Sequence, residues 1–99
     1  MPTEDIQRQL QIKVNVLKRC QKEHESYQQE VLTQERRIVD LEASGAADES
    51  TLNKQRQVLG ESQRMVPECA TRVEQAKRDL KAFLERHPDQ QNSHEALLS

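Results

Sequence analysis

Residues 6–41 read IQRQLQIKVNVLKRCQKEHESYQQEVLTQERRIVDL and carry an apolar side chain at most positions of a repeat with alternating steps of four and three residues. The repeating positions are Ile6, Leu10, Lys13, Leu17, Cys20, His24, Tyr27, Val31, Gln34, Ile38 and Leu41. This heptad spacing places them on one stripe, or seam, of an α-helix. Because a random polar sequence would not keep this register, the stretch predicts one amphipathic helix over about residues 5–42 rather than a disordered chain.

The same repeat returns in the second half of the chain. It runs through Leu52, Gln55, Leu59, Ser62, Val66, Cys69, Val73, Ala76, Leu80, Phe83 and His87. A second helix is therefore expected over about residues 51–87. In the turn 43–50, Gly45 suits the left-handed end of a helix, and Asp48, Ser50 or Thr51 can cap the next one. So short a connection predicts an all-α fold, an antiparallel hairpin of two long coiled-coil-like helices.

A proline lies inside the second predicted helix. Pro67 removes a backbone donor, leaves the carbonyl of Gln63 without its helical partner and disfavours helical angles at Val66. Since the repeat continues in phase on both sides, we predict one helix kinked at residue 67 rather than two helices. The heptad places Pro67, like Gly60 one heptad earlier, next to the seam but on its outer side.

The apolar stripe is wider than two helices would bury. The flanking apolar residues are Val14, Val16, Val58, Met65 and Leu84. Pro88 ends the second helix, and the segment 89–99 has room for a short third one that includes Leu97 and Leu98. We therefore expect one domain over residues 1–99, a three-helix bundle. A second copy of the hairpin is the other candidate to cover the flanking residues.

Composition excludes several classes of protein. Hydrophobic residues make up 33% of the chain, with one Tyr, one Phe and no Trp. That is too few for a β-sandwich or an apolar pocket for a small substrate. The net charge of -2 disfavours nucleic-acid binding, and no apolar run approaches the ~18 residues of a membrane span. With no secretion signal and two widely spaced cysteines, we expect reduced thiols in the cytosol.

Catalysis and metal binding also find little support. The chain has no Gly-rich phosphate loop, and its paired carboxylates fall on solvated helix faces. Cys20, His24 and Cys69 could converge along the seam, but structural zinc requires four ligands. We therefore interpret Cys20, Cys69 and His24 as side chains that pack along the seam, not as metal ligands. We expect no enzymatic activity, no metal and no cofactor.

The outermost positions of the first helix are basic or neutral. They are Arg8, Asn15, Lys22, Gln29 and Arg36, and Lys18 and Arg19 lie beside them. A solvated charged face explains this pattern without any function. The functional interpretation is a basic strip along a rigid rod that docks onto an acidic protein surface.

Several short motifs resemble one known family, that of tubulin-binding cofactor A, also called tubulin-specific chaperone A. In the first helix they are Val16-Leu17-Lys18-Arg19, Lys22-Glu23, Tyr27, Glu30 and Gln34-Glu35. The second helix contributes Lys54-Gln55, Leu59, Glu61-Ser62 and Arg64-Met65-Val66-Pro67-Glu68-Cys69, the most specific string. The similarity spans about residues 10–87, in order and without large gaps. Two departures are Gly60, where a better helix former is expected, and a tail after His87 shorter than the family pattern.

The resemblance implies a non-catalytic three-helix bundle of the cytoplasm, associated with the cytoskeleton. Its partner would be β-tubulin, an acidic protein released from the chaperonin and passed on, with other tubulin-folding cofactors, for αβ-heterodimer assembly. Family binding is attributed to helical faces. By position, the candidate β-tubulin-binding residues are Lys18, Arg19, Lys22, Arg36, Arg64 and Pro67. The alternative is a coiled-coil dimerisation or scaffold module with no chaperone role, since heptads report only that a seam exists.

Overall fold

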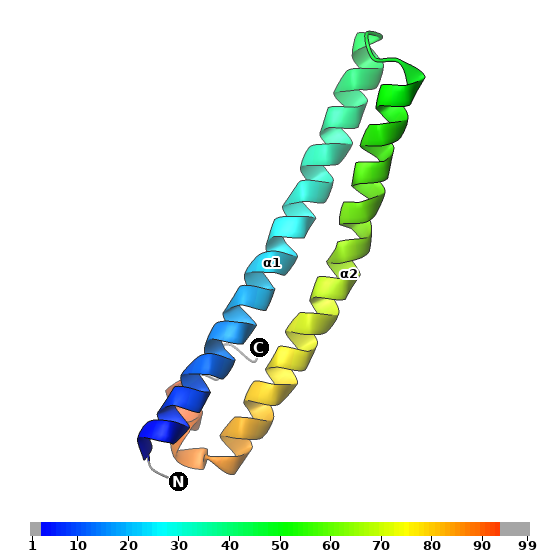
Figure 1. Cartoon of the computed structure of the whole chain (residues 1–99). Helices are drawn as coiled ribbons and strands as arrows, with labels where there is room; N and C mark the ends of the chain where they lie inside the picture. The colour runs from blue at the N-terminus through cyan, green and yellow to red at the C-terminus, as the bar shows by residue number, and fades with distance from the viewer. Residues whose placement is uncertain (1–2, 94–99) are drawn as a thin grey trace.

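Two long antiparallel helices make up most of the computed structural model, which describes residues 3–93 (Figure 1). Helix α1 spans Thr3–Ser44 and has 42 residues, and helix α2 spans Glu49–Arg86 and has 38. A short 3₁₀ helix, η1, follows at Pro88–Ser93. The molecule is a rod with extents of 64 × 19 × 17 Å. The described residues contain no strand, so the predicted all-α hairpin is confirmed.

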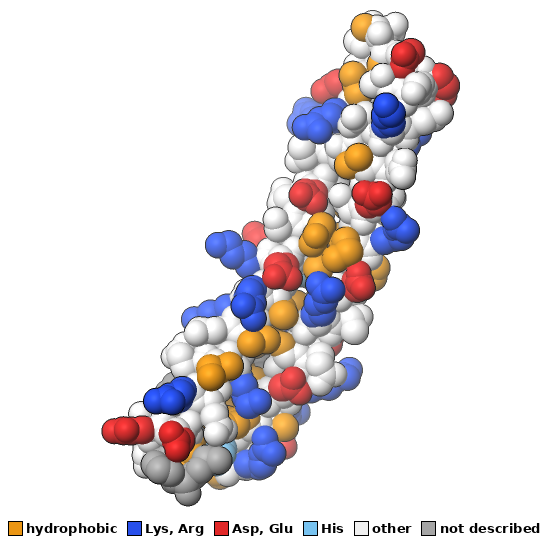
Figure 2. All heavy atoms as spheres, in the orientation of Figure 1, with side chains coloured by type: hydrophobic (Ala, Val, Ile, Leu, Met, Phe, Trp, Pro, Cys, Tyr) orange, Lys and Arg blue, Asp and Glu red, His pale blue; other side chains and the backbone are white. Residues whose placement is uncertain are grey.

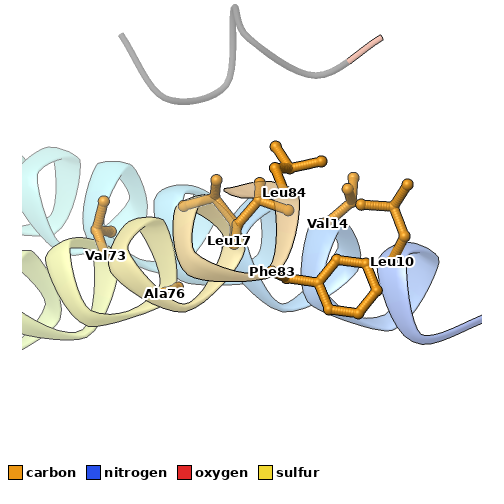
Figure 3. Close-up of a cluster of buried hydrophobic side chains, with 8 residues drawn as sticks. Leu10, Val14, Leu17, Val73, Ala76, Phe83 and Leu84 are labelled. Atoms are coloured by element: carbon orange, nitrogen blue, oxygen red, sulfur yellow. The ribbon is translucent and has the colours of Figure 1, made fainter. Parts of the chain in front are cut away.

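The predicted seam holds the two helices together. Every seam position named from the sequence, in both helices, is buried or half-buried. Leu17 of α1 and Leu80 of α2 are 0% exposed. Figure 3 shows the cluster that they belong to, where Leu10, Leu17 and Phe83 contribute side chains from opposite helices. This cluster, near the open end of the hairpin, is the main apolar core.

Farther toward the turn, the seam becomes polar. Gln34 is buried, and its Nε2 donates to the backbone carbonyl of Gln55 at 3.0 Å and to the side-chain oxygen of Gln55 at 2.7 Å. Ser62 is also buried, and its Oγ lies 3.5 Å from Oε2 of Glu30. A buried polar group is costly unless it is paired, so these contacts favour one register of α1 against α2.

The turn has the chemistry expected from its residues. Gly45 has φ +65°, the left-handed conformation that glycine adopts without strain, and its N–H donates to the carbonyl of Glu42 at 3.3 Å. Asp48 is the N-cap of α2, and its Oδ1 accepts from the Thr51 N–H at 2.8 Å. Of the three cap candidates, the structure therefore selects Asp48.

Pro67 does not break α2, which is continuous from Glu49 to Arg86. The expectation of one helix is confirmed, whereas the kink itself stays a prediction. Pro67 is exposed, as its heptad position predicts, and its carbonyl accepts a hydrogen bond from Thr71 Oγ1 at 3.1 Å.

The predicted third helix, and with it the three-helix bundle, is not confirmed by the described residues. After α2 they contain only the 3₁₀ helix η1, whose sequence PDQQNS has no large apolar side chain to pack against the hairpin. Residues 94–99, where the expected helix would continue, lie outside the described residues. Of the flanking apolar residues, Val14 and Leu84 are 2% exposed in the main core, whereas Val58 is 45% exposed.

The two glycines provide a matched stability test. A Cβ added at Gly60, inside α2, would meet no heavy atom within 4 Å. Gly60→Ala should therefore raise the free energy of unfolding by about 0.5–1 kcal/mol, because alanine loses less backbone entropy in a helix. Gly45→Ala should lower it by about 1–2 kcal/mol, because a Cβ is strained at positive φ. Urea unfolding followed by circular dichroism measures both, and a destabilised Gly60→Ala variant would contradict this account.

The cap of α2 should make stability depend on pH. The hydrogen bonds from Thr51, the backbone N–H foremost, lower the pKa of the Asp48 carboxyl below its ordinary value of 3.8. A lowered folded-state pKa means that this stabilisation is complete at neutral pH. It is lost as pH falls from about 3.8 through the folded-state pKa.

We expect Asp48→Ala to lower the urea midpoint at pH 7, and the gap from the wild type to shrink near pH 2. Asp48→Asn is the control, because asparagine still caps a helix but does not titrate. At pH 7 the urea midpoint of Asp48→Asn should lie below that of the wild type by less than that of Asp48→Ala does, and near pH 2 this difference should vanish. A gap that is equal at both pH values would show that the Asp48 charge contributes nothing.

Candidate partner-binding surfaces

Four of the predicted binding residues lie on the outer face of α1. Lys18, Arg19 and Lys22 lie within about one turn of each other, and Arg36 follows about 21 Å farther along the helix. All four are exposed. We call this set, Lys18, Arg19, Lys22 and Arg36, the α1 basic strip. Its regular helix backbone holds the four side chains in a fixed order along the rod.

The cations of the α1 basic strip have no partner among the described residues, neither an acidic side chain nor a hydrogen-bond acceptor. Two arginines elsewhere on the rod, by contrast, form ion pairs. Arg56 lies 3.6 Å from Glu42 and 3.4 Å from Glu49, and Arg72 lies 4.0 Å from Glu23. The strip therefore has its full charge available for an acidic surface, with no internal ion pair to break first.

Arg64 and Pro67, the other two predicted binding residues, belong to α2. Both are exposed. Pro67 lies at an outer heptad position of α2, whereas Arg64 lines a groove that also includes Glu30 of α1. The structure thus brings four of the six predicted residues together on α1 and places the other two on α2, about one turn apart. A partner that contacts all six must contact both helices.

A groove between the helices was not predicted from the sequence. It has a volume of about 560 Å³ and lies midway along the rod. Tyr27 of α1 and Val58 and Met65 of α2 provide its apolar surface, and Glu30, Glu61, Arg64 and Glu68 provide its charged rim. We call it the middle groove. Figure 2 shows apolar side chains at this level, with charged side chains on either side.

Only part of the signal for the middle groove was visible in the sequence. Val58 and Met65 are seven residues apart beside the seam and were expected to need a cover. The convergence of Glu30 with Glu61 and Glu68 depends on the alignment of α1 against α2, which one helix alone does not specify.

Cys20, Cys69 and His24, which the sequence places on the seam, are buried or half-buried in the structure. Cys69 is 1% exposed, and the half-buried Cys20 packs against the main core. His24 is half-buried. Within residues 3–93, no three His, Cys, Asp or Glu side chains lie close enough together to hold a metal ion. None of the helices described is long and apolar enough to cross a membrane.

These features define a class: a rigid helical hairpin that presents charged strips and shallow grooves on its exterior. Within this class, the chain belongs to the tubulin binding cofactor A family, whose sequence profile matches residues 5–99. It is 38% identical over 88 residues to tubulin-specific chaperone A of Gallus gallus, which covers 89% of this chain and 81% of the relative.

A plant relative agrees in sequence and in structure. Tubulin-folding cofactor A of Arabidopsis thaliana is 43% identical over 77 residues, which cover 78% of this chain and 67% of the relative. The crystal structure of tubulin folding cofactor A from Arabidopsis thaliana superimposes with a TM-score of 0.74 at 40% identity. That match covers 84% of this chain and 77% of the other. The resemblance seen in the sequence is thereby confirmed.

Proposed function

We propose that this protein is a tubulin-folding chaperone that captures β-tubulin intermediates after their release from the chaperonin and hands them on for αβ-heterodimer assembly. Membership of the tubulin binding cofactor A family supports the client class. The observation that carries the proposal is the α1 basic strip, whose exposed cations lack partners among the described residues. Such a strip complements the acidic surface of a tubulin client.

Capture in this proposal is a surface event, without catalysis, nucleotide or cofactor. The rod is already folded, so binding orders mainly side chains and loses little backbone entropy. Lys18, Arg19 and Lys22 attract the client and set its orientation, and Arg36 extends the contact toward the turn. Each exposed ion pair contributes only about 0.2–1 kcal/mol, so the complex can dissociate again, as a hand-over requires.

Arg64 and Pro67 form a second contact in this proposal, on α2. Both are exposed on α2, where a client that wraps around the hairpin would reach them. We place the activity in the cytoplasm, in association with the cytoskeleton. Other tubulin-folding cofactors are the expected recipients of the client.

A triple charge reversal tests the proposal. Lys18→Glu, Arg19→Glu and Lys22→Glu together should weaken β-tubulin capture about tenfold or more at physiological salt, because three ion pairs become three repulsions. The measurement is a titration of purified β-tubulin intermediate released from the chaperonin, with circular dichroism to confirm the helical fold.

The matched control reverses three exposed cations elsewhere, Lys54→Glu, Arg78→Glu and Lys81→Glu, with the same change in net charge. It should retain capture. If capture survives the first set of reversals, or if both sets weaken it equally, the α1 basic strip is not the binding surface.

One observation favours a second candidate function, a dimerisation or scaffold module. Leu32 and Val39 are seven residues apart on the outer part of α1 and are 60% and 63% exposed. A repeated exposed apolar position is typical of a helix that packs against another chain. Analytical ultracentrifugation with a pull-down from cytosol separates the candidates. An obligate dimer that ignores tubulin would establish the scaffold and overturn the chaperone proposal.

A further inference from the structure

The middle groove combines an apolar surface with an acidic rim. Tyr27 and Met65 are half-buried and Val58 is 45% exposed, so apolar atoms of both helices remain open to solvent. A methionine at such a site adapts its shape to different apolar side chains. A groove between two antiparallel helices also has the geometry that accepts a third, amphipathic helix.

The charges around this surface are unequal. Glu30, Glu61 and Glu68 are exposed carboxylates on the rim, and among the described residues that line the groove Arg64 is the one Lys or Arg. Ser62 of α2 lies beside Glu30, with its Oγ 3.5 Å from Oε2 of Glu30. An occupant of the groove must therefore cover apolar atoms and bring positive charge to the rim.

This charge argues against the two occupants that the chain itself could supply. A symmetric dimer through the groove would bring together two rims that each carry three glutamates and one arginine, and this excess of negative charge is unfavourable. The C-terminal segment 94–99, HEALLS, contains Glu95 and neither lysine nor arginine, so it does not complement the rim either.

We propose that the middle groove docks a basic amphipathic helix of a partner protein, one that presents two apolar side chains a turn apart between lysines or arginines. The apolar pair packs on Tyr27, Val58 and Met65, and the flanking cations meet Glu30, Glu61 and Glu68. The middle groove binds a positively charged partner, whereas the α1 basic strip binds a negatively charged one. The hairpin thus has two binding surfaces of opposite preference.

The test uses two labelled helical peptides of about four turns. Both have leucines spaced one turn apart, flanked by lysines in the first peptide and by glutamates in the second. The first should bind the full chain in fluorescence anisotropy, and it should shift the methyl NMR signals of Val58 and Met65. Glu61→Lys with Glu68→Lys should weaken the lysine peptide about tenfold and allow the glutamate peptide to bind, because each rim contact changes sign.

The control pair, Glu25→Lys with Glu35→Lys, makes the same net charge change at exposed α1 positions outside the groove and should leave the binding of both peptides unchanged. Circular dichroism confirms that all variants remain folded. The proposal fails if the lysine peptide does not bind, or if the control pair weakens it as strongly as the rim pair.

Two further results would assign the groove to the chain itself and so overturn the proposal. One is a dimer, seen by sedimentation, that Val58→Ser dissociates. The other is a change in the Val58 and Met65 methyl signals when Leu97→Ser and Leu98→Ser are introduced without any peptide. Because none of these readouts uses tubulin, loss of β-tubulin capture and loss of peptide binding are distinguishable.

Discussion

The apolar seam between two antiparallel helices is the constraint on which the rest of the structure depends. Leu17 and Leu80 are 0% exposed where the helices meet, and Phe83 fills the same core at 2%. Full burial of one such side chain contributes about 1.5–3 kcal/mol, and its truncation to alanine costs about 2–5 kcal/mol. With few other apolar residues available, the chain keeps its helices long and its exterior polar.

This use of apolar residues explains why function falls on the outer surface. The seam holds together a rod of 64 × 19 × 17 Å, and the groove described on it lies open between the two helices. The polar contacts of Gln34 with Gln55 favour one alignment of the helices. That alignment brings Glu30 of α1 opposite Glu61 and Glu68 of α2, so the register of the hairpin also determines the charge of the middle groove.

Much of the fold was predictable because it follows from local patterns. The heptads located every seam residue, Gly45 marked the end of α1, and the heptad position of Lys22 placed it on the outer face. Predictions that required knowledge of neighbouring elements were weaker. Asp48 could not be chosen over Ser50 or Thr51 as the cap, and a third helix after Pro88 is not confirmed within the described residues.

The sequence by itself determined that two amphipathic helices pair through a seam and that Lys18, Arg19 and Lys22 lie on one outer face. Both conclusions follow from the period of a single helix, because the spacing of residues along the sequence decides which of them share a face. Only the tertiary structure decided that Arg64 lines the same groove as Glu30 of α1, and that Tyr27, Val58 and Met65 form its apolar surface. These relations depend on the register and facing of two helices, which packing across the seam determines and the sequence of either helix alone does not.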